Sequence, residues 1–428
     1  MKTFTDSSRF SKITTWIVAL VVCLALAPAV EATNGYYTHG YGTKSKGLAG
    51  AGVAFPQEIM IAGTNPAGLA FLGKRYEVGV AVFNPNRSYT VEGNPSGFPG
   101  TFGLVPGTVE SDSNYFYIPH LGANWQLNEA NTLGVVIYGH GGMNTDYDFA
   151  AFRASKPTGV NLSQLFVGVP WAIQFGDKHA VSIMPVFVYQ EFEAQGFMSF
   201  APFSSNPAKL SDNGKDTSTG YGAKIGYMGK WFEKFSFGAS YQSEMEMDEF
   251  GEYAGLFAEQ GGFNIPATWT AGIAVHPTDA FTFVMDLQRI YYSDIKSVGN
   301  PFLPNLQTAR LGDDNGAGFG WEDMDVVKIG VQYDPANSWT WRFGYSYGAQ
   351  PIPGSEVMFN IISPGIMEDH LTFGFTKKLG ESRGLNIALM YAPEVTVTGP
   401  NPLEAPGAQT IELAMDQVEF EISYSWGF

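Results

Sequence analysis

Apolar and polar side chains alternate with a period of two along many segments of this chain. The final segment, VEFEISYSWGF (418–428), carries an apolar side chain at every second position. The same alternation recurs in segments that include 77–83, 132–138, 235–241, 269–275, 327–333, 339–347, 371–375 and 385–391. A period of two predicts β-strands with one apolar and one polar face, so the sequence predicts an all-β fold.

The connections between these segments alternate in length. Short polar turns precede outgoing strands at LNEAN, GDKH, HPTD, DPANS and KLGESRG. Long segments separate the other strand ends, at about 93–112, 146–160, 197–217, 248–264, 297–322, 352–366 and 399–410. Short turns at one end and long loops at the other are typical of transmembrane antiparallel β-barrels, and the pattern predicts about 14 strands. A soluble β-sandwich is the alternative, but it has no reason to alternate its connection lengths.

The first 32 residues have the features of a secretory signal peptide. Basic residues precede an apolar run from about 13 to 27, and Ala32 is a small residue at the expected cleavage position. The run is shorter than the ~20 residues that a membrane-spanning helix needs. We therefore predict a signal peptide at 1–32. Its removal takes away Cys23, the only cysteine, so we expect no disulfides in the mature chain.

The chain is acidic, with 24 basic and 41 acidic residues and a formal net charge of −17. An acidic exported protein is a poor partner for nucleic acid. A closed barrel leaves no unpaired strand edge in lipid, so its last strand must present apolar side chains to the membrane. We expect Tyr424, Trp426 and Phe428 in the aromatic girdle near the periplasmic interface. The terminal aromatic residue resembles the signal that barrel-assembly machinery recognises, which makes that machinery an expected partner during biogenesis.

Charged residues fall in the alternate phase of several strands, which predicts that they face the lumen. They are Lys224, Lys328, Arg342, Glu419 and Glu421. A lumenal position avoids the ~2–4 kcal/mol cost of a basic group at the bilayer midplane. Two roles are open: an ion-pair network, or the binding of an anionic head group. Lys328 and Arg342, on neighbouring strands of one hairpin, are the candidates for the second role.

The segment 33–75 differs from the barrel wall that we predict over 76–428. It is rich in glycine, lacks sustained alternation, and still carries enough apolar residues to need burial. We predict that it forms a hatch, a plug inside the lumen, although a disordered periplasmic arm is the alternative.

Glycines cluster in the predicted third strand at Gly139, Gly141 and Gly142, around His140. Glycine inside a strand weakens the ladder and permits a bend or bulge, which predicts a kink and an opening in the wall. A lone histidine there is better explained as a hydrogen-bonding spacer than as a metal ligand.

Two of the predicted long loops carry aromatic residues, which are Phe200, Phe203, Phe250, Tyr253 and Phe257. The last three have helical spacing, and exposed apolar patches often mark binding sites. We expect a surface groove between these loops that binds a hydrophobic ligand before it enters the barrel. The alternative is that the loops only pack on each other.

Several stretches resemble the FadL family of outer-membrane long-chain fatty acid and hydrocarbon transporters (OMPP1/FadL/TodX type). They are NGYYTHGYGTKSKGLAGAGVA (34–54), TNPAGLA (64–70) with the triplet Asn65, Pro66 and Ala67, YGHGGMNTDY (138–147) and DLQRIYYSDIKSVGNP (286–301). The resemblance implies a hatch motif at the triplet and a lateral exit at the kink. It also implies ligand-lining roles for Tyr36 and Tyr37, and a monomer in the outer membrane of a Gram-negative bacterium, among lipid and lipopolysaccharide.

We therefore predict passive uptake of hydrophobic compounds, with long-chain fatty acids first and neutral aromatic or aliphatic hydrocarbons as the alternative. A general hydrophilic porin is a further alternative. Catalysis is not expected, because a hydrolase needs a serine and a histidine in register and no histidine has a convincing serine partner. We expect no catalytic residues, cofactor or metal.

Overall fold

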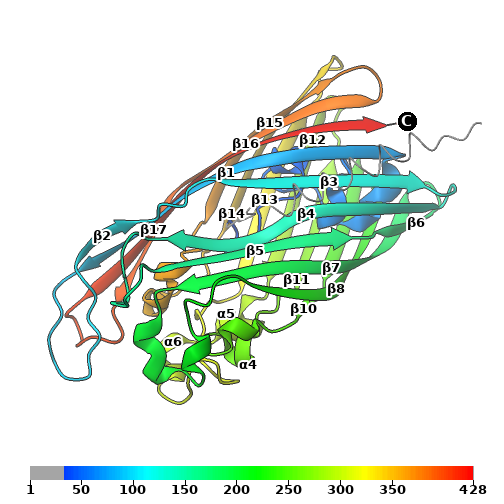
Figure 1. Ribbon diagram of the computed structural model, residues 1–428. Helices are drawn as coiled ribbons and strands as arrows, with labels where there is room; N and C mark the ends of the chain where they lie inside the picture. The colour runs from blue at the N-terminus through cyan, green and yellow to red at the C-terminus, as the bar shows by residue number, and fades with distance from the viewer. Residues whose placement is uncertain (1–32, 428) are drawn as a thin grey trace, which may run out of the picture.

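The computed structural model describes residues 33–427, which form a closed antiparallel β-barrel with a segment of chain inside it (Figure 1). The predicted signal peptide and Phe428 lie outside the described residues. The strands are β1 (Arg75–Glu92), β2 (Gly107–Glu110), β3 (Phe116–Gln126), β4 (Asn131–Asp146), β5 (Gly159–Gly168), β6 (Trp171–Phe175), β7 (His179–Gln195), β8 (Asp216–Phe232), β9 (Phe235–Gln242), β10 (Glu246–Met247), β11 (Thr268–Val275), β12 (Phe281–Ile290), β13 (Met324–Tyr333), β14 (Trp339–Gly348), β15 (Asp369–Lys378), β16 (Arg383–Pro400) and β17 (Thr410–Gly427).

These segments make 14 wall strands, because three of the 17 do not count separately. β5 and β6 both pair with β4 and β7, so they are two parts of one strand. β9 and β10 likewise both pair with β8. β2 pairs only with the far end of β1. The ring closes where β1 pairs with β17, from Arg75 opposite Gly427 to Glu92 opposite Thr410. The predicted fold and strand number are confirmed.

Short helical segments lie in the loops and in the internal segment. They are α2 (Thr43–Lys46), α3 (Ile61–Thr64), η1 (Pro66–Phe71), η2 (Met198–Phe203), η3 (Pro207–Lys209), η4 (Gly251–Tyr253), α4 (Ala258–Gly261), η5 (Tyr292–Asp294), α5 (Lys296–Gly299), α6 (Phe302–Leu306), η6 (Gly354–Glu356) and η7 (Phe359–Ile362). Within residues 33–427, no helix has the length and apolar character to cross a membrane.

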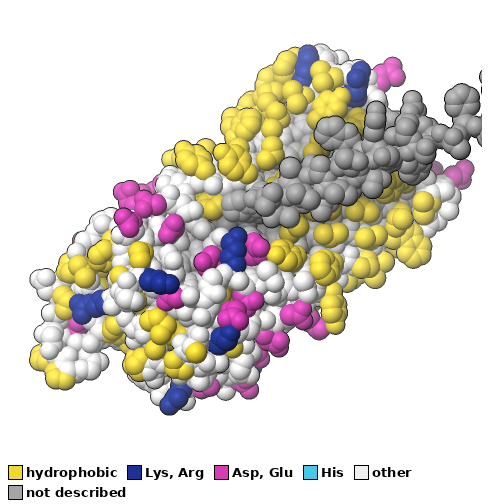
Figure 2. Space-filling model, viewed as in Figure 1, with side chains coloured by type: hydrophobic (Ala, Val, Ile, Leu, Met, Phe, Trp, Pro, Cys, Tyr) yellow, Lys and Arg dark blue, Asp and Glu magenta, His cyan; other side chains and the backbone are white. Residues whose placement is uncertain are grey.

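The two faces of the strands follow the predicted phase. On β13 and β14, Ile329 and Phe343 are exposed on the outside, whereas Lys328 and Arg342 are buried inside. On β17, Val418 and Phe420 are likewise exposed, and the glutamates between and beyond them are buried. Figure 2 shows the outer apolar side chains gathered over the upper right of the barrel, and many charged side chains toward the long loops at the lower left. An apolar exterior of this kind is expected for a barrel wall that is surrounded by lipid.

The segment 33–74 lies inside the barrel, where it is drawn in dark blue in Figure 1. Lys46 forms ion pairs of 2.9 Å with both Glu419 and Glu421 on β17. The carboxylate of Asp286 on β12 accepts hydrogen bonds from the amides of Gly52, at 2.8 Å, and Val53, at 2.9 Å. The internal segment therefore forms ion pairs or hydrogen bonds with these charged groups of the wall, which favours the ion-pair role predicted for the lumenal glutamates.

Candidate functional site

The wall is interrupted at β4, the third wall strand. Within the described residues, the pairing of β3 with β4 ends at His120 opposite Tyr138. The pairing of β4 with β5 continues, but it contains a bulge between Gly139 and Gly141. β4 therefore bends away from β3 at the glycine cluster, and the sequence correctly indicated a strand irregularity there.

The internal segment occupies the edge of β4 beyond this bend. The carbonyl oxygen of Tyr36 accepts a hydrogen bond from the amide of Gly142, at 3.0 Å, and the amide of Thr38 donates to the carbonyl of His140, at 3.1 Å. A Cβ added to Gly141 would lie 2.1 Å from the Tyr36 oxygen, so only glycine permits this approach. The N-terminal end of the internal segment thus acts as a short extra strand on β4.

His140 is fully buried between rings from the wall and from the internal segment. Its ring stacks on Phe166 of β5, with 4.0 Å between centroids, and its Nδ1 lies 2.6 Å from the Tyr41 hydroxyl. These contacts agree with a spacer role for His140. In the part of the chain that the structure describes, no three His, Cys, Asp or Glu side chains are placed to hold a metal ion.

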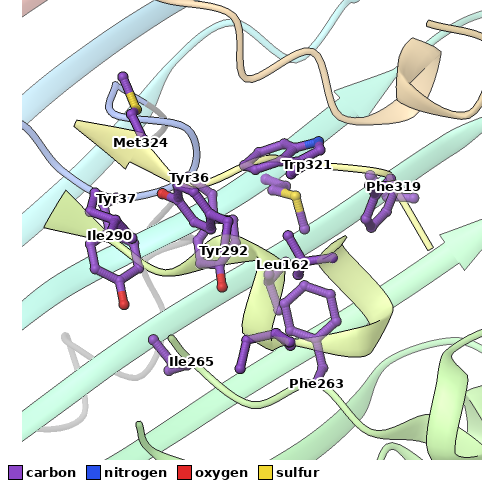
Figure 3. Close-up of a cluster of buried hydrophobic side chains, with 14 of the residues drawn as sticks. Tyr36, Tyr37, Leu162, Phe263, Ile265, Ile290, Tyr292, Phe319, Trp321 and Met324 are labelled. Atoms are coloured by element: carbon purple, nitrogen blue, oxygen red, sulfur yellow. The ribbon is translucent and has the colours of Figure 1, made fainter. Parts of the chain in front are cut away.

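Tyr36 lies at the centre of an aromatic cluster, which Figure 3 shows in close-up. Its ring centroid is 5.1 Å from that of Tyr292, 5.7 Å from that of Trp321 and 6.1 Å from that of Phe263. Burial, reinforced by Tyr292, raises the pKa of Tyr36, so its hydroxyl stays neutral. That hydroxyl is buried and has no hydrogen-bond partner among the described residues. An unsatisfied buried donor is costly, which makes it a candidate contact for a ligand.

A small cavity adjoins the cluster and the bent strand. Its volume is about 20 Å³, close to the space that one water molecule needs. Its lining includes Gly35, Phe83, Arg87, Met143, Trp321 and Met415. A ligand larger than about one water molecule would therefore require the side chains around this cavity to move.

Arg87 of β1 is the basic residue in this cavity lining, and the sequence analysis did not identify it. Its guanidinium donates to the carbonyls of Pro85 and Ser113, to the Ser111 hydroxyl and to the Asn144 side-chain oxygen. Its Nε is buried without a hydrogen-bond partner within the described chain. Arg87 lies on the inward face of β1, and the alternation of apolar and polar residues in this strand could have predicted that its side chain faces the lumen. The alternation could not have predicted that Arg87 lies beside the cavity.

A larger cleft opens among the long loops. Its volume is about 580 Å³, and its lining includes Arg289, Trp321, Glu322, Asp323 and Glu356. Trp321 therefore lines both the outer cleft and the inner cavity. Its indole nitrogen donates a hydrogen bond of 2.6 Å to Asn360 on η7. Trp321 forms the partition between the two spaces.

The triplet Asn65, Pro66 and Ala67 joins the internal segment to the wall. The Asn65 side chain accepts a hydrogen bond from the Ala67 amide, which caps η1, and donates to the carbonyls of Val53 and Tyr227 on β8. A Cβ on Gly226 would lie 2.1 Å from the Asn65 oxygen. Asn65 therefore caps η1 and also tethers the internal segment to β8. Pro66 occupies the first position of η1, which suits proline.

The two proposed head-group residues do not line the small cavity. The ammonium of Lys328 donates to the His39 carbonyl over 2.8 Å, and Arg342 binds the Gln57 side chain over 2.8 and 3.0 Å. In the register of the hairpin, Lys328 is opposite Ser346, four residues along β14 from Arg342. Both residues hold the internal segment, and they are not brought together at one site.

The aromatic loop residues differ from the expected exposed groove. Phe250, Tyr253 and Phe257 are buried around Phe192, at centroid distances of 4.7–5.5 Å. They do not share one helical face, because the segment contains only the short η4 and α4 with extended residues before each. The expected helical stripe is therefore wrong, and apolar burial explains these rings.

Phe200 and Phe203 differ in burial. Phe200 is buried against Phe102, Phe152, Phe302 and Phe359, whereas 48% of Phe203 is exposed. The loops pack mainly on each other, which is the alternative that the sequence left open.

A 14-stranded barrel with an apolar exterior and an interrupted wall is the architecture of a β-barrel membrane channel. Residues 24–363 match the sequence profile of the family described as Outer membrane protein transport protein (OMPP1/FadL/TodX), and the chain belongs to this family. It is therefore an outer-membrane β-barrel of Gram-negative bacteria that transports hydrophobic compounds, and it is not an enzyme.

Solved structures share this fold at low sequence identity. The toluene transporter TodX of P. putida is 18% identical, with a TM-score of 0.66, over 91% of this chain and 99% of that one. The toluene transporter TbuX of Ralstonia pickettii is 18% identical, with a TM-score of 0.63, over 91% and 99%. A FadL homologue of Pseudomonas aeruginosa is 14% identical, with a TM-score of 0.67, over 92% and 100%. A comparison with curated protein sequences finds no match.

Proposed function

We propose that this channel takes up long-chain fatty acids by passive diffusion and releases them sideways into the membrane at the bend of β4. The ligand enters the outer cleft, displaces Trp321, expands the inner cavity and leaves beside Gly141. Residues 33–74 act as the hatch, which blocks the lumen and must move locally during each passage.

The observation that carries the fatty acid assignment is Arg87. An arginine binds a carboxylate through two parallel hydrogen bonds. Phe83, Met143 and Met415 give this cavity an apolar part beside Arg87, although Asn144 and Ser363 also line it. An amphipathic monoanion presents the matching features, a carboxylate and an aliphatic tail. Tyr36, whose buried hydroxyl lacks a partner in the described chain, is a second donor for the head group.

The sideways release is supported by the interruption of the wall at the bend. Two backbone hydrogen bonds, from Gly142 to Tyr36 and from Thr38 to His140, join the hatch to this edge of β4, and the Tyr41 hydroxyl lies 2.6 Å from the His140 ring. Each backbone bond contributes about 0.5–1.5 kcal/mol net, so opening this edge requires the loss of local contacts and not the unfolding of the wall.

A neutral hydrocarbon is the second candidate, favoured by the charge of the outer cleft. Glu322, Asp323 and Glu356 line it together with a single basic residue, Arg289, which is already paired with Asp323 at 3.1 Å. A net negative entrance disfavours anions and does not affect toluene-like compounds. A general porin is less well supported, because residues 33–74 occupy the lumen that a hydrophilic solute would need.

The test is uptake of oleate and of toluene by cells that express the full chain or its variants. We expect Arg87→Gln to lower oleate uptake about tenfold, as for the loss of one charge-assisted interaction, and to leave toluene uptake unchanged. Arg310→Gln is the matched control, because it removes an exposed arginine that lines neither the inner cavity nor the outer cleft. Equal loss of both compounds in Arg87→Gln, or no loss of oleate uptake, would reject carboxylate recognition and favour the neutral ligand.

A further inference from the structure

A second cavity lies at the periplasmic end of the barrel, on the opposite side of the hatch from the long loops. Its volume is about 530 Å³, and short turns of the wall form its rim. Six basic residues line it: Lys44, Lys74, Arg75, Arg342, Lys378 and Arg383. The acidic residues in the lining are Asp334 and Glu381. A cavity with a positive excess of four is unusual in a chain with a net charge of −17.

The cavity lies between part of the hatch and one half of the wall. Lys44 and Gln57 line it from the hatch, whereas Arg342, Lys378 and Arg383 line it from β14, β15 and β16. η1 of the hatch packs against β4, β6, β7 and β8, and α2 packs against β15, β16 and β17. The cavity is therefore a gap beside the contact of α2 with the wall, and it has basic groups of the hatch on one side and of the wall on the other.

The two basic groups deepest in the cavity are held in fixed positions by the hatch. Arg342 donates to the Gln57 side-chain oxygen and, over 2.8 Å, to the Thr376 hydroxyl. The ammonium of Lys44 donates to the Gln57 carbonyl over 3.1 Å. The Nε of Arg342 also donates to the Gln57 side-chain oxygen, over 3.0 Å. These four contacts leave N–H groups on both side chains for a further acceptor. Burial lowers the pKa of Lys44 to about 8, so its ammonium still carries a charge at pH 7.

We propose that this cavity binds a phosphate-bearing anion, which bridges the hatch and the wall and holds the hatch in place. A phosphate group presents several oxygens in different directions, so it can accept from Lys44 on one side and from Arg342 or Arg383 on the other. A monocarboxylate has only two oxygens in one plane and fits this divided set of donors less well. The source of the group is either free phosphate from the periplasm or a phospholipid head group from the inner leaflet.

The bound anion restrains the hatch because it removes the repulsion between basic groups on the two sides of the cavity. This inference does not depend on which hydrophobic compound the channel carries, since it concerns the opposite end of the hatch from Tyr36 and Arg87.

The test is hydrogen exchange of residues 44–58 in the full purified chain, first in a neutral detergent with inorganic phosphate added. We expect phosphate to slow exchange in this segment in a saturable manner, and sodium chloride at matched ionic strength to have no such effect. The double variant Lys378→Gln and Arg383→Gln should weaken the apparent phosphate affinity about tenfold. Lys178→Gln, on the exposed turn before β7, is the control and should leave the affinity unchanged.

A second arm distinguishes the two sources. Nanodiscs of phosphatidylglycerol and of phosphatidylcholine are compared without free phosphate; protection in the first alone identifies a lipid head group, whereas protection that appears only with added phosphate identifies the free ion. Equal protection by chloride, or an unchanged affinity in the double variant, would overturn the proposal. Neither result bears on oleate uptake, so this inference and the proposed function fail separately.

Discussion

The carbonyl oxygen of Tyr36 lies 3.0 Å from the amide nitrogen of Gly142 and accepts its hydrogen bond. The two residues are more than a hundred positions apart, and this contact joins the hatch to the bent strand of the wall. This contact and the neighbouring hydrogen bond from Thr38 to His140 couple the hatch to the wall opening, so a change at Gly142 should affect the position of Tyr36.

Gly141→Ala should displace the hatch from β4, because the new Cβ would lie 2.1 Å from the Tyr36 oxygen. We expect faster hydrogen exchange at residues 34–38 and a stability loss of about 1–3 kcal/mol, as for other forced contacts in packed interiors. Gly251→Ala is the control, because a Cβ there meets no atom within 4 Å and the backbone conformation suits alanine. Unchanged exchange in Gly141→Ala would show that the hatch tolerates a shift at this edge.

Lys46→Met should destabilise the folded barrel strongly, because it removes the 2.9 Å ion pairs with the buried Glu419 and Glu421 and leaves Glu421 with the longer contact to His120, at 3.6 Å. The expected loss is about 3–5 kcal/mol in the free energy of unfolding, measured by denaturant titration of the reconstituted protein. The triple variant with Glu419→Gln and Glu421→Gln should recover part of that loss.

The control for this buried ion pair is an exposed one. Lys296 and Glu259 lie 2.8 Å apart with side chains 41% and 50% exposed, so Lys296→Met should change stability by less than about 1 kcal/mol. If Lys46→Met is no worse than this control, the buried cluster does not hold the hatch.

Asn65→Ala should loosen the hatch without unfolding the barrel. The substitution removes the cap of η1 and leaves the carbonyls of Val53 and Tyr227 without their side-chain donor. We expect local opening to become easier by about 1–3 kcal/mol, seen as faster proteolysis within residues 53–71. Asn213→Ala, in an exposed loop, is the control; equal proteolysis in the two variants would mean that Asn65 is not the tether.

Trp321→Ala should join the outer cleft to the inner cavity, since this side chain lines both. We expect faster uptake of oleate and toluene alike, together with a stability cost of about 3–5 kcal/mol for the loss of a large buried ring. Phe319→Ala removes a neighbouring ring, 6.5 Å from Trp321, that lines neither space and should leave uptake unchanged. A Trp321→Ala channel with normal uptake rates would show that ligands do not pass this point.

The loops illustrate where sequence reasoning failed. The spacing of Phe250, Tyr253 and Phe257 fits a helix, yet the residues before η4 and α4 are extended and the rings pack on Phe192 of β7. Such a partner lies far away in sequence. The loop also folds back on itself, because the amide of Phe250 donates to the carbonyl of Gly261, and the spacing of the rings does not reveal this path.

The sequence by itself determined the barrel, the strand number and the face on which each strand residue lies, because a period of two has only two phases and lipid accepts only one of them. It also located the bend in β4, since clustered glycines interrupt a strand through local conformation alone.

Only the tertiary structure decided which inward residues meet. Lys328 and Arg342 bind the hatch, and Arg87 lies beside the small cavity, because the curvature of the closed wall and the path of the hatch inside it set these distances. No local pattern in the chain encodes contacts between residues separated by hundreds of positions.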